Sequence, residues 1–258
     1  DSRNRTPDDN GGFNGVNDYA GFVTLDELAV SSYYFVNNNA ELRSDLTAKK
    51  SVFFFGNKIV CIGAGINNTY EDNTVLAPNK QTIETVVENI FYSSNNSIPT
   101  SSEAEGDVQL VPGRDTVMPD AFYVMRYGGI YIPSDKNDDF YVKLNTTSGG
   151  NFVEVWIDHG KLPENATYEY VIVPSTCMRI DDFFSFAETP DYTVLSNTES
   201  VQAVSDGASG VTGYTFWEGA ECNGITTDFA CNMIVKETEN EITIAISDFT
   251  HYGAGNQT

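Results

Sequence analysis

Residues Thr47–Asn68 read TAKKSVFFFGNKIVCIGAGINN, and this stretch decides the fold class of the chain. Two apolar runs, 52–55 and 59–62, flank the turn residues Gly56-Asn57-Lys58. Aromatic and β-branched residues on both sides of a Gly-Asn turn are typical of a β-hairpin. Both runs are continuous rather than alternating, which predicts strands that are buried on both faces.

Much of the remaining sequence repeats this β pattern. The residues 122–125 and 130–132 flank a Gly-containing turn and predict a second hairpin. Residues 152–158 alternate between two faces, with Val153, Val155 and Ile157 on one side, and we expect 168–173 to be the neighbouring strand. Shorter strands are expected at 82–88, 193–195, 201–204, 214–217, 233–236 and 242–247, with helical turns at 40–51 and 181–187. Short strands between Gly- and Asn-rich turns predict an all-β antiparallel sandwich.

The charge balance limits the partners of this chain. It has 14 basic and 37 acidic residues, which gives 14 − 37 = −23. Nucleic acid is therefore not an expected partner, because phosphate binding needs a basic surface. No run of 18 apolar residues occurs in the sequence, so we expect no membrane span.

Cysteines and asparagines suggest an extracellular protein. Cys222 and Cys231 bracket a short turn, which is typical of a local disulfide, whereas Cys61 lies in an apolar strand and is expected to be a buried thiol. Six Asn-x-Ser/Thr sequons are candidate glycosylation sites, although an Asn- and Thr-rich chain also produces them by chance. They are Asn4, Asn67, Asn95, Asn145, Asn165 and Asn256.

A few polar residues are candidates for contact with a sugar. His159 follows Asp158, but neighbouring strand residues point to opposite faces, so His159 is expected to cap a strand end, with a glycan contact as the alternative. Arg126 and Tyr127 lie in a turn, and Asn67 and Asn68 end a hairpin strand. Each pair is therefore placed where a loop meets solvent.

No strong cofactor motif occurs. Asp8, Asp9 and Asp18 are weak calcium candidates, because their spacing fits no EF-hand loop and a solvated segment explains them equally. The sequence has no G-x-S-x-G elbow and no phosphate-binding loop. We expect no cofactor and no other metal.

Several ordered blocks across roughly residues 19–250 resemble polysaccharide lyase family eight, the hyaluronate, chondroitin AC and xanthan lyases. The first is the Lys-Ser-aromatic run at Lys50 that ends in Gly63-Ala64-Gly65-Ile66, followed by Glu84-Thr85 to Glu88-Asn89. Later blocks read WIDHG at 156–160, ATYEYVIVP at 166–174, VQAV at 201–204, GYTFW at 213–217, IVKE at 234–237 and ITIAISD at 242–248.

The resemblance implies a particular place in a larger enzyme. Such lyases join a helical toroid to a large antiparallel β-sandwich and a smaller C-terminal β-domain. This chain resembles the second half of the sandwich and the start of the last domain. We therefore expect an irregular lead-in at 1–18, part of the sandwich at 19–190 and the C-terminal domain from 191 to 258. The family's catalytic Asn, His, Tyr and Arg lie on the helical domain, so none is assigned here.

The function that the resemblance implies is β-elimination on uronic-acid polysaccharides by a complete, secreted enzyme. This chain alone is then expected to be inactive and to dock to the N-terminal portion of the same precursor or to another chain. The alternative is a non-catalytic, carbohydrate-binding or structural extracellular module. The acidic charge favours this alternative, because it repels a polyanion at short range.

Overall fold

The computed structural model describes residues 19–37, 45–69, 82–92, 97–101, 107–148 and 150–248. Within these ranges the chain forms strands and one short helix, and the paired strands are antiparallel. The prediction of an all-β antiparallel fold is confirmed. No helix in these ranges is long and apolar enough to cross a membrane.

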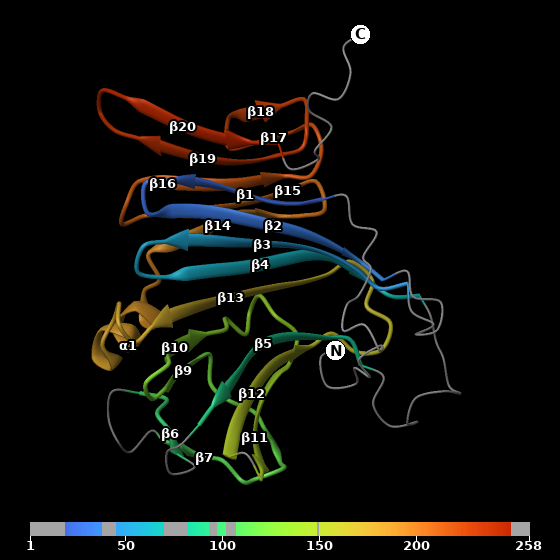
Figure 1. The fold of residues 1–258 in the computed structure, drawn as a ribbon, viewed down its shortest axis with the longest axis vertical. Helices are drawn as coiled ribbons and strands as arrows, with labels where there is room; N and C mark the ends of the chain where they lie inside the picture. Colours follow the sequence, from blue (N-terminus) through green and yellow to red (C-terminus); the bar gives the residue numbers. More distant parts are fainter. Residues whose placement is uncertain are drawn as a thin grey trace.

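The largest sheet has seven strands (Figure 1). Its order is β1 (Ala20–Leu25), β2 (Leu28–Val36), β3 (Thr47–Phe55), β4 (Ile59–Asn67), β13 (Ala166–Pro174), β10 (Gly128–Tyr131) and β9 (Ala121–Val124). The predicted hairpins are present as β3–β4 and β9–β10. At the first turn, Gly56 has a φ of 68°, a conformation that glycine adopts without steric cost.

The second sheet has four strands and covers only one end of the first (Figure 1). Its order is β5 (Glu84–Phe91), β12 (Gly150–Asp158), β11 (Phe140–Thr147) and β8 (Asp115–Thr116). The prediction that 168–173 lies beside 152–158 is wrong, because β13 pairs with β4 and β10. The physical reason is burial: β13 packs Tyr168 into one core and Val171 into another, which requires a position covered on both faces.

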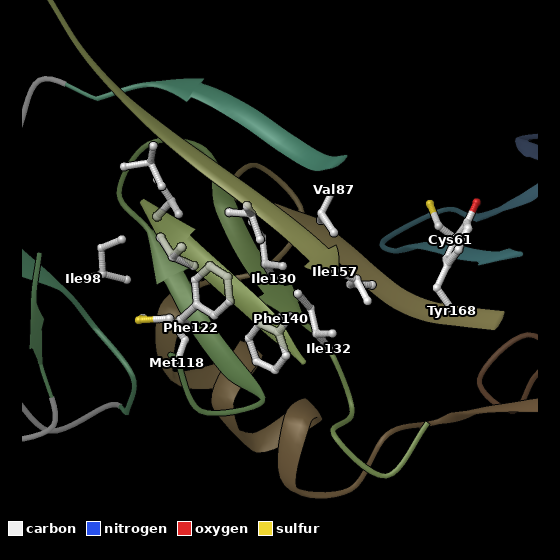
Figure 2. Close-up of a cluster of buried hydrophobic side chains, with 14 of the residues drawn as sticks. Cys61, Val87, Ile98, Met118, Phe122, Ile130, Ile132, Phe140, Ile157 and Tyr168 are labelled. Atoms are coloured by element: carbon white, nitrogen blue, oxygen red, sulfur yellow. The ribbon is translucent and has the colours of Figure 1, made fainter. Parts of the chain in front are cut away.

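The first core fills the space between these two sheets (Figure 2). Phe122 and Ile130 from the large sheet meet Phe140 and Ile157 from the small one, and all four are buried. Cys61 and Tyr168 lie at the other side of the same cluster, as Figure 2 shows. Two short strands, β6 (Ser97–Ile98) and β7 (Val108–Gln109), pair beside it.

A third sheet packs on the opposite face of the large one. Its order is β14 (Tyr192–Asn197), β15 (Val201–Asp206), β16 (Val211–Phe216), β19 (Cys231–Glu237) and β20 (Ile242–Ser247), and β17 (Ala220–Cys222) pairs with β18 (Ile225–Thr227) nearby. Phe53 and Val60 of the hairpin share a core with Val204 and Ile234 of this sheet. All the strands predicted after residue 193 are present.

Helix α1 (Ile180–Glu188) connects the layers. Its buried residues Phe183, Phe184 and Phe186 join the core between the large and third sheets. The helix matches the turn predicted at 181–187. The helical turn expected at 40–51 is wrong where the structure describes it, since β3 already begins at Thr47. The rest of that segment, like the lead-in at 1–18, lies outside the described residues.

Candidate functional site

Asn67 and Asn68 hold the connection between β12 and β13. The Asn165 backbone N–H donates to Asn67 Oδ1 over 2.7 Å. Asn68 is buried, and its Nδ2 donates to the Lys161 carbonyl over 3.2 Å while its backbone N–H donates to the Pro163 carbonyl. Both side chains therefore bind the protein itself.

His159 is the first residue of this connection, and its ring lies between the side chains of Asp138 and Thr85. Its Nδ1 is 3.0 Å from Asp138 Oδ2, and its Nε2 is 2.9 Å from Thr85 Oγ1. Because a carboxylate only accepts, Nδ1 carries the proton when the imidazole is neutral, and Nε2 then accepts from the Thr85 hydroxyl. Asp158 instead accepts from the Gly160 N–H.

The arrangement around His159 resembles the spacing of a nucleophile, a base and an orienting acid. Thr85 and His159 are both buried, however, and the Thr85 hydroxyl points at the ring rather than at a surface. The three residues join β5, the 133–139 segment and the end of β12. This geometry agrees with the predicted role of His159 at a strand end, and its contact with a glycan stays a prediction.

Tyr127 and Arg126 occupy the β9–β10 turn, near the other end of β13. The Tyr127 hydroxyl donates to Glu88, and burial followed by this contact raises the pKa of Tyr127. Arg126 has a φ of 70° and an exposed side chain, and its carbonyl accepts from the Ser175 hydroxyl over 3.1 Å. Of this pair, the Arg126 side chain is exposed and the Tyr127 side chain is half-buried.

Cys61 lies within hydrogen-bonding reach of Tyr170 in the core between the two sheets. Burial raises the pKa of the Cys61 thiol to about 12. A thiol is a nucleophile only as its thiolate, so Cys61 is inert at neutral pH, as predicted for a buried structural cysteine.

The five predicted contact residues form two groups in the structure. The first is Asn67, Asn68 and His159, and the second is Arg126 and Tyr127.

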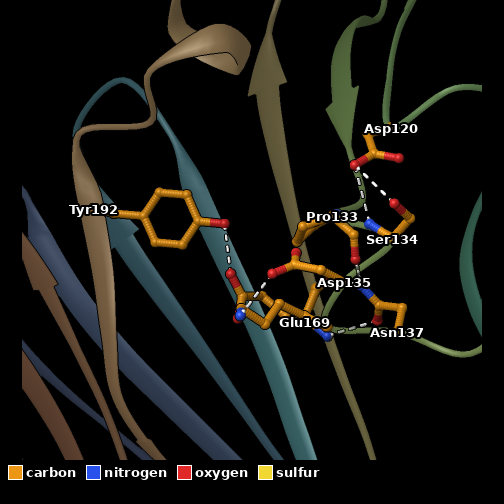
Figure 3. A network of polar contacts seen from close by, with 8 residues as sticks. Asp120, Pro133, Ser134, Asp135, Asn137, Glu169 and Tyr192 are labelled. Atoms are coloured by element: carbon orange, nitrogen blue, oxygen red, sulfur yellow. Dashed lines mark hydrogen bonds and ion pairs between the residues drawn. The ribbon is translucent and has the colours of Figure 1, made fainter.

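A polar network missed by the sequence reasoning links β13 to β14 (Figure 3). The Tyr192 hydroxyl donates to Glu169 Oε1 over 2.7 Å, and burial raises the pKa of Glu169. Asn137 holds the same strand, accepting from the Glu169 N–H and donating to the Glu169 carbonyl. Tyr192 reaches Glu169 because the third sheet packs against the large sheet. The sequence around either residue does not indicate this contact.

The disulfide predicted between Cys222 and Cys231 is not formed in the structure. Both cysteines are free and buried in one cluster.

The predicted glycosylation sites differ in exposure. Among the sequons, Asn165 is exposed, and Asn67 and Asn145 are half-buried. Asn4, Asn95, Asn256, Asp8, Asp9 and Asp18 lie outside the described residues. In the part of the chain that the structure describes, no group of three or more His, Cys, Asp or Glu residues is placed to hold a metal.

Sequence models of two consecutive domains match the chain in order. The super-sandwich domain of polysaccharide lyase family 8 matches residues 1–179, and the C-terminal beta-sandwich domain of the same family matches residues 193–255. The chain belongs to polysaccharide lyase family 8. The resemblance read from the sequence is thereby confirmed, as is a large sandwich followed by a C-terminal one.

Curated family 8 lyases align with most of the chain. Chondroitinase-AC from Pedobacter heparinus is 26% identical over 92% of the chain, and hyaluronate lyase HylB from Enterococcus faecalis is 27% identical over 90%. The chain spans only 33% and 24% of the lengths of these two relatives. It therefore corresponds to a fraction of each lyase.

Solved family 8 structures share the fold. A Paenibacillus xanthan lyase superposes with a TM-score of 0.73 at 25% identity, covering 90% of this chain and 23% of the lyase. A chondroitinase AC lyase superposes with the same TM-score at 23% identity and covers 93% of this chain. These solved lyases therefore share the fold of this chain over most of its length.

Proposed function

We propose that this chain is the β-sandwich portion of a secreted lyase that cleaves uronic-acid polysaccharides of the hyaluronan, chondroitin or xanthan type. The observation that carries the proposal is the ordered match of both family 8 domains. The named substrates of the relatives support the substrate class: chondroitin, hyaluronan and xanthan lyases all align with it. The six sequons agree with a location outside the cell.

The proposed reaction is a β-elimination. A base removes the proton at C5 beside the uronate carboxylate, and a polar group neutralises that carboxylate. The electron pair forms a C4=C5 double bond as the C4–O bond breaks, and an acid protonates the leaving oxygen. We place these catalytic groups on a helical portion outside this chain, so that the sandwich scaffolds the site.

The residues described here agree with a scaffold role. Asn67, Asn68 and Tyr127 direct their polar groups to protein partners, and both nitrogens of His159 have protein partners. Arg126 alone among the five candidates has an exposed side chain that could approach an acidic sugar. It remains the best candidate for a substrate contact in this chain.

The test is an elimination assay on the longer protein that contains this chain. Hyaluronan, chondroitin and xanthan are supplied separately, and the ultraviolet absorbance of the unsaturated uronate is followed. Absorbance that grows with one or more of them supports the proposal. Cleavage without any unsaturated product would point to hydrolysis and overturn it.

A second candidate is a non-catalytic, carbohydrate-binding or structural module. The net charge of −23 favours it, since an acidic surface repels an acidic polymer. Affinity electrophoresis separates the two. A longer protein that is retarded by neutral glycans and yields no unsaturated product is such a module.

A further inference from the structure

Three neighbouring strands of the four-stranded sheet, β11, β12 and β5, carry one row of side chains that points away from the core (Figure 1). Asn145 of β11 lies directly opposite Phe152 of β12, and Phe152 lies directly opposite Phe91 of β5. Directly opposed residues point to the same face of a sheet. Leu144 and Val153, the chain neighbours of this row, are buried between the two sheets, so alternation places the row on the outer face.

The two phenylalanines of this row form an exposed aromatic pair. Their ring centres are 5.6 Å apart in an edge-to-face arrangement. Gly150 leaves room for the Phe91 ring, because a Cβ at position 150 would clash with it. The ring is thus held against the sheet, yet Phe91 is 60% exposed. An apolar surface of this kind is covered favourably by another apolar surface, such as the C–H face of a sugar ring.

The other end of the row is a glycosylation sequon. Asn145 begins the sequon 145–147, whose two threonines are exposed and which ends β11 at the β11–β12 hairpin. No hydrogen bond joins the Asn145 amide to a described residue, whereas the Asn67 amide oxygen of another sequon accepts from the Asn165 N–H. On its other side β11 pairs with β8 only before Asn145. The described part of the sheet therefore leaves the Asn145 side chain open to modification.

We propose that Asn145 carries an N-linked glycan whose first sugars pack over Phe152 and Phe91. Opposed Cβ atoms on neighbouring strands are about 4.5–5.5 Å apart, and Phe91 lies two strand spacings, about 10 Å, from Asn145. A sugar joined to the Asn145 amide therefore passes over Phe152 toward the exposed Phe91 ring. The inference rests on the secretion in the proposed function and not on the elimination reaction.

The modification is a group transfer from a polyprenyl-diphosphate-linked oligosaccharide in the secretory pathway. Nδ2 of Asn145 attacks C1 of the first sugar, the bond from C1 to the diphosphate oxygen breaks, and a base of the transferase takes the Nδ2 proton. The diphosphate leaves with the electron pair. Because the transfer acts on the chain before β11 has formed, the half-buried position of Asn145 in the folded sheet does not prevent it.

Peptide mapping tests the modification. The chain is secreted from a eukaryotic cell, and its glycopeptides are treated with peptide N-glycosidase in heavy-oxygen water, which marks each modified asparagine. Asn145 should be marked. Thr147→Ala should abolish the mark, and Thr147→Ser, which keeps the sequon, should preserve it. An unmodified Asn145 overturns the proposal and leaves the Phe91 ring to another partner.

Thermal unfolding tests the packing of the sugar. Asn145→Gln should lower the unfolding midpoint of the secreted chain by about 2–4 °C more than that of the chain made in the bacterial cytoplasm, where no glycan is attached. Asn165→Gln, at the exposed sequon, is the matched control and should have the same effect in both preparations. Phe91→Ala should abolish the dependence on preparation, since the sugar then has no ring to cover. An effect of Asn145→Gln that is equal in both preparations, or that keeps its dependence in Phe91→Ala, overturns the packing.

The same peptide map, applied to the longer lyase, separates this proposal from the proposed function. A longer lyase that makes unsaturated product with an unmodified Asn145 keeps the function and overturns the glycan. One with a modified Asn145 and no unsaturated product supports the glycan and loses the function.

Discussion

Lys58 and Asp206 form a buried ion pair between the β3–β4 turn and the third sheet, with 2.5 Å between Nζ and Oδ1. Asp191 lies 2.8 Å from the same ammonium. Asp206 also accepts from the Ser209 N–H over 2.9 Å, and Lys58 Nζ lies 6.0 Å from the centre of the Phe186 ring. The turn that decides the fold is thus tied by charge to the C-terminal sheet.

Lys58→Met should therefore destabilise the chain strongly. Removing one partner of a buried pair costs about 3–5 kcal/mol, because the remaining charge stays buried without compensation. Chemical denaturation measures the loss. Adding Asp206→Asn should recover part of it, and Lys136→Ala, which breaks an exposed pair with Asp135, should change little. A Lys58→Met chain as stable as Lys136→Ala would contradict this role.

Gln202 joins the same two layers through hydrogen bonds. Its Oε1 accepts from Ser51 Oγ over 2.5 Å and from Trp217 Nε1 over 3.1 Å. Gln202→Leu should lower the free energy of unfolding by roughly 2–6 kcal/mol, from about 1–3 for each donor left buried without an acceptor. Ser200→Ala, at an exposed hydrogen bond, is the control. Equal stability of the two variants would show that water satisfies both donors.

Gly63 leaves room for the Tyr168 ring, which lies over it from the neighbouring strand of the large sheet. A Cβ at position 63 would lie 2.1 Å from Cε1 of the Tyr168 ring, which is buried. Gly63→Ala should thus cost about 1–3 kcal/mol in thermal or denaturant unfolding. Combining it with Tyr168→Leu should cost less than the sum of the single changes. Simple additivity would mean that the clash is relieved elsewhere.

Glu169 makes stability depend on pH. Burial raises its pKa in the folded state, so the folded chain binds this proton more tightly than the unfolded chain. Its contribution to stability is fully present below its unfolded pKa of about 4.3 and is lost as pH rises through the higher, folded value. Tyr192 donates to it, and Lys136 and Asp135 are the charges that face it.

Glu169→Gln should remove this titration. As pH rises from about 4 to 7, the native chain loses this contribution and the variant does not, so the variant should become more stable relative to the native chain. Denaturation midpoints across that range measure it, and other carboxylates cancel in the difference. A constant difference would show that Glu169 titrates normally in the folded state.

The sequence predicted those parts of the fold that local patterns determine. The Gly56 turn, the second hairpin at Arg126 and the five late strands are all signalled by apolar runs between turn residues. The partner of β13 was not, since Tyr168 and Val171 lie on opposite faces of the strand and the sequence does not indicate which layer covers each face. A third sheet was needed to bury both.

The candidate site was less predictable for the same reason. His159 was identified by its type, but Thr85 and Asp138, which fix its ring, are 74 and 21 residues away. Tyr127 was read as exposed, whereas β5 brings Glu88 to its hydroxyl. Pairings across sheets set these contacts, and alternation along one strand does not encode them.

The most direct test of the proposal that this chain scaffolds a lyase whose catalytic groups lie elsewhere is a reconstitution. The chain and the upstream portion of the same lyase are produced separately, and unsaturated uronate from hyaluronan, chondroitin and xanthan is measured for each alone and for the mixture. We predict no product from the isolated chain and product from the mixture. Turnover by the isolated chain would contradict the account, whether or not it survives replacement of His159 and Arg126, and so would a mixture that makes no product.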